Sequence, residues 1–222
     1  MNQNASSATT ARSPFNQTHS TALRIWHWVT FLTITFILLT VLFASTLLNP
    51  RSNNVAVQKI LKEKSVEITE QQAFGVAHFF DDKMWDLHKL LGYGLAFLVL
   101  ARIVIEFTQS QEEKVKSRMK NALTLFKQNG VDKKEFKHYL IVKWSYSLFY
   151  LIILYMAISG LCMAFGRDLG IPRELNHTIK EIHGFCQYLI YAFVLFHLIG
   201  VIYADLGKTK GIVSGMINGG LK

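Results

Sequence analysis

The chain has 222 residues, half of them hydrophobic and 18% charged, with a formal net charge of +9 and a mean hydropathy of +0.23. The apolar residues gather in long blocks instead of alternating with polar ones, which excludes an ordinary soluble domain and predicts membrane-spanning helices. The two cysteines exclude a disulfide-stapled fold.

Residues 1–21 are polar and lack the apolar segment of a signal peptide, so we expect a disordered tail. The first uncharged block covers 29–48, and a membrane helix is predicted at 22–48. A loop at 49–86 follows, with an amphipathic stretch at 55–67. The second helix is predicted at 87–108, because Lys89, Arg102 and Glu106 lie near its ends, where long side chains reach the membrane surface.

A basic loop is predicted at 109–143, with a surface helix that ends at Gly130. Uncharged blocks then predict the third helix at 144–165 and the fourth at 183–205, joined by a loop at 166–182. The glycines of the tail at 206–222 predict irregular structure over 211–222. The expected fold is therefore all-α, an integral membrane four-helix bundle.

Charge sets the expected orientation. Residues 109–143 hold nine Lys and Arg against four Asp and Glu, whereas acids balance the cations of 49–86 and 166–182. The positive-inside rule therefore places both termini and the basic loop in the cytoplasm. The same cations suit contact with anionic lipid, so we expect a membrane-lipid partner and no nucleic acid.

The fourth block carries two histidines, His183 and His197, fourteen residues apart, and has no charge over 184–204. At about 100° per residue their rings project from nearly the same helix face, about 21 Å apart along the axis. Histidine is costly inside a membrane and needs a partner there. The spacing therefore predicts two ligand sites stacked across the bilayer, as on a helix shared by two haems.

Two further histidines lie at matching depths. His27 opens the first helix at its cytoplasmic end, and His88 opens the second at its outer end. Depth matching pairs His88 with His183 outside and His27 with His197 inside. An iron held by two histidines suits electron transfer. The alternatives are histidines that only bond neighbouring helices, and a zinc site, for which the spans offer few acidic ligands.

Five segments carry a family resemblance: RIWHW (24–28), HKLLGYG (88–94), LARIVIEF (100–107), ISGLCMAF (158–165) and the fourteen-residue histidine pair. Together they resemble the four-helix di-haem b-type cytochromes. These include the cytochrome b subunits of nickel–iron hydrogenases and formate dehydrogenases, and the bacterial cytochrome b-561 proteins. The resemblance covers about 23–205 and implies two non-covalent b haems, the same helix pairing and a bacterial inner membrane. A c-type haem is excluded because no CxxCH motif is present.

Four other residues are candidates for binding roles. Gly92 would leave room for a porphyrin, or else for close helix packing. Arg102 lies fourteen residues after His88, where it could pair with a propionate of the inner haem or extend to the membrane surface. His138 and Lys143 precede the third helix and could donate to a quinone, or else be solvated.

The expected function is electron transfer between an extracytoplasmic redox protein or dehydrogenase subunit and the quinone pool. No catalytic residue is assigned, because a subunit of a quinone-linked oxidoreductase fits the sequence better than a self-sufficient enzyme. Two alternatives stay open. One is a stand-alone superoxide:quinone oxidoreductase, and the other is a metal transporter.

Overall fold

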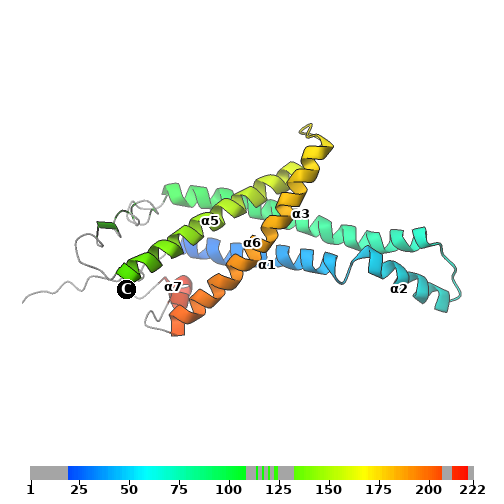
Figure 1. Cartoon of the computed structure of the whole chain (residues 1–222), viewed down its shortest axis with the longest axis horizontal. Coiled ribbons are helices and arrows are strands. Elements are labelled where there is room, and N and C mark those ends of the chain that lie inside the picture. The colour runs from blue at the N-terminus through cyan, green and yellow to red at the C-terminus, as the bar shows by residue number, and fades with distance from the viewer. Residues whose placement is uncertain are drawn as a thin grey trace, which may run out of the picture.

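The computed structural model describes residues 20–108, 133–206 and 212–219, and the single positions 114, 117, 120, 123 and 124. These parts of the chain contain helices and no strand. The helices are α1 (Thr21–Ser45), α2 (Pro50–Glu63), α3 (Glu70–Thr108), α5 (Lys133–Ala164), α6 (Arg173–Leu206) and α7 (Ile212–Asn218) (Figure 1). Four of them, α1, α3, α5 and α6, contain a stretch long and apolar enough to cross a membrane. The predicted all-α membrane fold is therefore confirmed.

The four long helices pack in a chain of pairs. Helix α1 lies along α3, α3 also packs against α5, and α5 packs against α6. Helix α2 continues beyond α1 and lies along the N-terminal half of α3. Among the described residues, α1 and α6 make no extended backbone packing with each other. The bundle is therefore closed between α1 and α6 by side chains.

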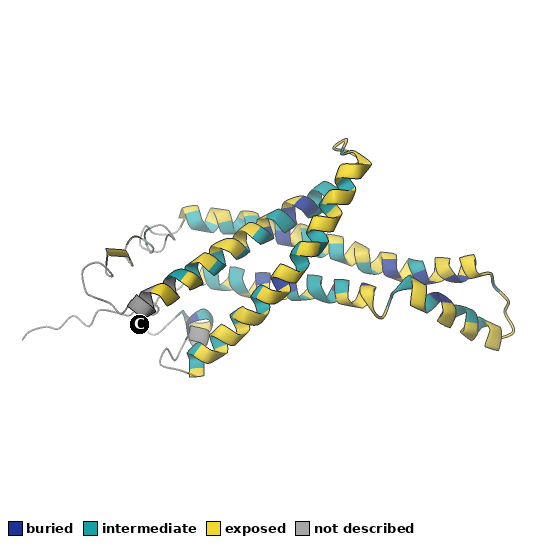
Figure 2. Ribbon diagram, in the orientation of Figure 1, coloured by how far each residue is buried: buried dark blue, intermediate teal, exposed yellow. Residues whose placement is uncertain are grey.

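One buried residue from each long helix forms the core: Ile34, Leu95, Ile153 and Ile190. This core is small, and most large apolar side chains on the helices are exposed (Figure 2). Such a surface would be unstable in water but matches the hydrocarbon interior of a bilayer. A position in the membrane therefore explains both the exposed apolar surface and the long uncharged blocks in the sequence.

Local side-chain hydrogen bonds explain where α1 and α2 begin. They also satisfy the hydroxyl groups inside α1. The Ser20 side chain accepts a hydrogen bond from the Leu23 amide at 3.4 Å, and Asn49 accepts one from the Arg51 amide at 3.0 Å. Both are N-caps, and Pro50 follows the second at a position that suits proline. Inside α1, the hydroxyls of Thr33 and Thr35 donate to carbonyls four residues earlier, so they enter the membrane already paired.

Several helix boundaries differ from the sequence expectations. Helices α3, α5 and α6 begin at Glu70, Lys133 and Arg173, each inside a segment that was expected to be a loop. The predicted second membrane helix at 87–108 is the C-terminal part of a continuous helix that begins at Glu70. The amphipathic stretch predicted at 55–67 overlaps α2, which ends at Glu63, before Ser65 adopts a positive φ of 59°. The predicted N-terminal tail and the surface helix before Gly130 lie almost entirely outside the described residues.

The expectation of irregular structure at 211–222 is wrong for the part that forms α7. Two side chains from the start of α1 hold this helix. The Arg24 guanidinium donates to the Ile217 carbonyl, and the Trp28 indole donates to the Met216 carbonyl at 3.1 Å. These carbonyls lie in the last turn of a short helix, where they have no partner within the helix. Tertiary contacts therefore stabilise a helix that its glycine content disfavours.

Candidate functional site

Two histidines meet where α1 faces α6. The ring centres of His27 and His197 are 6.4 Å apart, with an angle of 64° between the ring planes. A metal–imidazole bond of about 2 Å and about 1.1 Å from nitrogen to ring centre place two imidazoles that share one metal ion about 6 Å apart. The observed separation of 6.4 Å is close to this value.

Aromatic side chains surround this first pair. The Phe193 ring is parallel to the His197 ring, with centres 5.7 Å apart and an interplanar angle of 7°. Tyr146 meets the His197 ring at 6.1 Å, and Trp28 meets the His27 ring at 5.6 Å, both edge-on. Across the described residues no hydrogen bond reaches either histidine ring. The pair is therefore flanked by aromatic rings and is itself partly exposed.

The second pair predicted from the sequence is His88 on α3 and His183 on α6. Here each ring has a hydroxyl partner. His88 Nδ1 is 3.0 Å from Thr40 Oγ1, and His183 Nδ1 is 2.7 Å from Ser159 Oγ. Both hydroxyl residues are buried, Thr40 with 4% and Ser159 with 3% of its surface exposed. Sequence reasoning missed these two residues, because nothing in a list of residue types shows which hydroxyl faces a histidine.

Two glycines lie near this second pair. A Cβ atom on Gly160 would meet His183 Cε1 at 3.6 Å, an ordinary contact, so α5 passes close to this ring. A Cβ on Gly92, four residues after His88, would meet nothing within 4 Å. The space that the sequence analysis expected beside Gly92 is open in the structure, and its use by a porphyrin stays a prediction.

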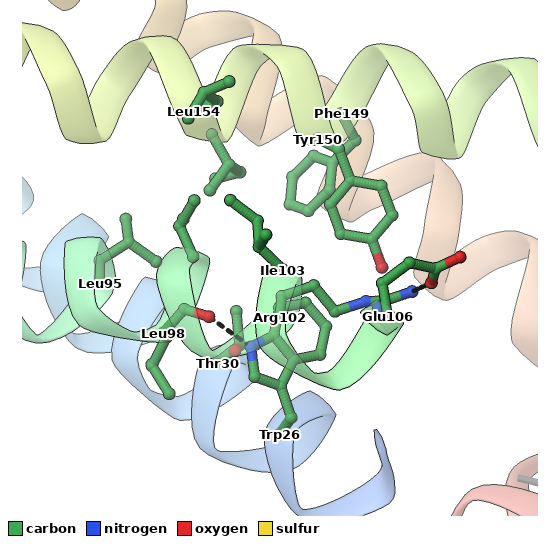
Figure 3. Close-up of a pocket in the computed structure, with 12 residues that line it drawn as sticks. Trp26, Thr30, Leu95, Leu98, Arg102, Ile103, Glu106, Phe149, Tyr150 and Leu154 are labelled. Atoms are coloured by element: carbon green, nitrogen blue, oxygen red, sulfur yellow. Dashed lines mark hydrogen bonds and ion pairs between the residues drawn. The ribbon is translucent and has the colours of Figure 1, made fainter. Parts of the chain in front are cut away.

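Arg102 lies at one end of an apolar cavity of about 290 Å³ between α1, α3 and α5 (Figure 3). Its Nη2 donates to Glu106 at 3.0 Å, and its guanidinium lies over the rings of Trp26 and Tyr150, at 5.8 and 5.7 Å. Its Nε and Nη1 are buried and have no hydrogen-bond partner among the described residues. Unpaired buried donors on a cation are costly, so this side of the guanidinium fits an anionic group such as a haem propionate.

Trp26 links this cavity to the first histidine pair. Its indole donates to the Leu98 carbonyl at 2.7 Å, which anchors α1 against α3, and the next residue along the chain is His27. Arg102 was predicted from the sequence, but its neighbours Trp26 and Tyr150 were not. The four-residue spacing of Arg102 and Glu106 was the available signal for their ion pair.

The proposed quinone donors lie in the first part of α5. The side chain of His138 is exposed and that of Lys143 is partly buried. Two remaining histidines are on helix surfaces. His78 pairs with Asp82 at 3.2 Å and His177 with Glu181 at 3.7 Å, all four side chains at least 45% exposed.

Comparison with known proteins identifies one family. A family model described as prokaryotic cytochrome b561 matches residues 18–219, nearly the whole chain. Neither the curated proteins nor the solved structures gave a significant match. The chain therefore belongs to the prokaryotic cytochrome b561 family, whose members are haem b proteins of membrane electron transport.

Proposed function

We propose that this member of the prokaryotic cytochrome b561 family binds two b haems, one at each histidine pair, and moves electrons across the membrane. The electrons pass between an extracytoplasmic redox partner and the quinone pool. The observation that carries the proposal is the 6.4 Å separation of the His27 and His197 rings. It is supported by His88 on α3 and His183 on α6, whose rings each contact a buried hydroxyl. The fourteen-residue spacing on α6 corresponds to about 21 Å of helix, most of the roughly 30 Å hydrocarbon layer.

Each part of the chain has a role in this function. A b haem with two histidine ligands supplies a one-electron carrier without an open coordination position. The histidines would hold the iron, and the surrounding apolar helices would exclude water and provide a low dielectric that tunes its potential. Arg102 would bind a propionate of the haem at His27 and His197 through its unpaired Nε and Nη1, and Gly92 would leave room for the other haem.

Orientation follows from charge. With the basic segment at 109–143 on the cytoplasmic side, as positive-inside distribution favours, both termini would also be cytoplasmic and the membrane a bacterial inner membrane. Helix α2 and the start of α3 would then project outside, next to His88 and His183. A redox partner would approach that end, and quinone would exchange near His138 and Lys143 at the other.

The metal-transporter alternative has less support. Among the described residues, the group of three metal-ligand side chains is His78, Asp81 and Asp82, which lies in the first half of α3 with two exposed members. The four candidate haem ligands, by contrast, sit in two separate pairs of histidines without carboxylates. That donor set suits two haems better than a transported cation, which needs a cluster of nitrogen, oxygen or sulfur ligands.

Haem content tests the proposal directly. Protein purified after expression with ample haem should contain two b haems per chain in a pyridine haemochrome assay, and a quinol should reduce them. A His177→Ala variant, which changes an exposed histidine, should keep both haems. A content of one haem or none in the parent protein would refute the two-site proposal.

A further inference from the structure

The hydroxyls of Thr40 and Ser159 contact the same atom, Nδ1, on the two histidines of one pair. The distances are 3.0 Å from Thr40 Oγ1 to His88 and 2.7 Å from Ser159 Oγ to His183. The two hydroxyls come from different helices, α1 and α5, and each approaches a histidine on a neighbouring helix. The same arrangement thus occurs twice around one site.

The donors and acceptors at these hydroxyls determine which ring nitrogen carries the proton. Thr40 Oγ1 donates to the Ile37 carbonyl at 2.6 Å, and Ser159 Oγ donates to the Tyr155 carbonyl at 2.7 Å. A hydroxyl has one proton, and here each carbonyl takes it. When the carbonyl takes the hydroxyl proton, the hydroxyl oxygen accepts from the histidine and the ring proton is on Nδ1. This leaves the Nε2 lone pair of His88 and of His183 for a metal.

We propose that Thr40 and Ser159 are positioning residues for the haem bound by His88 and His183, an inference that rests on the proposed function. They fix the Nδ1–H tautomer and the ring orientation before the haem binds. A hydrogen bond accepted from Nδ1–H also makes the imidazole a stronger electron donor, which stabilises the oxidised iron. The two hydroxyls therefore lower the midpoint potential of this haem.

The other pair supplies the internal comparison. Trp28, Tyr146 and Phe193 flank His27 and His197, and across the described part of the chain no hydroxyl bonds their rings. The two histidine pairs would thus offer the same kind of ligand but have different partners behind them. Because the hydroxyls lower the midpoint potential of the haem at His88 and His183 only, removing them should change the potential of that haem and not of the other.

Redox titration of the holoprotein tests the role. Thr40→Val and Ser159→Ala remove the hydroxyls with little change of shape. Each variant should raise the midpoint potential of the haem at His88 and His183, while the potential of the haem at His27 and His197 stays constant. Thr40→Ser and Ser159→Thr retain a hydroxyl and should keep the parent potential. Thr35→Val is the matched control. The Thr35 hydroxyl also donates to a carbonyl of α1, that of Phe31 at 2.9 Å, but among the described residues it bonds no histidine ring.

Two further readouts separate this role from simple packing. In oxidised-minus-reduced infrared spectra, the histidine ring bands should shift in Thr40→Val and Ser159→Ala and not in the Thr35→Val control. Haem loss from the altered site should become about tenfold faster or more, as for other partners of metal ligands. Unchanged potentials and ring bands in a protein with two haems would overturn the positioning role alone. Absence of the second haem from the parent protein would overturn the proposed function as well.

Discussion

Replacing Arg102 by glutamine should lower the midpoint potential of the haem at His27 and His197. The guanidinium is 5.8 Å from the ring of Trp26, the residue before His27, which puts its charge on the order of 10 Å from that site. At an effective dielectric constant of about 20, a unit charge at that distance contributes about 1.7 kcal/mol. At about 2.3 kcal/mol per 100 mV, this corresponds to a shift of about 70 mV. The shift is downward because the lost positive charge stabilises the added electron.

Glu106 provides the matched variants. It bonds Arg102 at 3.0 Å, so Glu106→Gln should raise the same potential. The double variant, with both residues changed to glutamine, removes no net charge and should stay close to the parent. Arg51→Gln, an exposed change on α2, should have no effect.

The assay is a spectroelectrochemical titration that resolves the two haems. An unchanged or raised potential in Arg102→Gln would refute the electrostatic reasoning. An equal shift of both haems would place Arg102 between the sites instead of beside one of them.

Three other predictions follow from the same sites. His27→Ala and His197→Ala should each remove one haem, and His88→Ala and His183→Ala the other, as resolved by low-temperature spectra; loss of the same haem in His27→Ala and His183→Ala would overturn the pairing. A reporter active only outside the cytoplasm should be active when fused within residues 53–64 and silent within 115–129, because of the basic loop; the opposite pattern would invert the topology. His138→Ala should slow haem reduction by quinol several-fold with both haem spectra unchanged, since His138 is a substrate contact in this proposal; a rate equal to the parent's would place the quinone site elsewhere.

The register of the histidines on α6 could be read from the sequence because it depends only on helix geometry. Once an uncharged block of membrane length is recognised, 3.6 residues per turn places His183 and His197 on one face. The contacts of Thr40 and Ser159 could not be read this way. Each depends on the rotation of one helix against another, to which many distant side chains contribute.

The extent of the helices shows the same limit. Charged residues outside the membrane do not reveal whether a segment is helical, so the long N-terminal extension of α3 from Glu70 was not predicted. Helix α7 was missed because its stability comes from Arg24 and Trp28, nearly two hundred residues earlier. Propensity alone gave the wrong expectation there, since tertiary contacts outweigh it.

The sequence by itself determined that the chain is an all-α membrane protein and that its fourth long helix presents two histidines to one side. Both follow from terms that act along a single helix: the cost of charge in lipid and the periodicity of the backbone. Only the tertiary structure decided which side chains stand behind each histidine. Hydroxyls bond His88 and His183, aromatic rings flank His27 and His197, and Arg102 faces Trp26 and Tyr150 with two donors unpaired. Those contacts join residues far apart in the chain, so they exist only once the helices have packed.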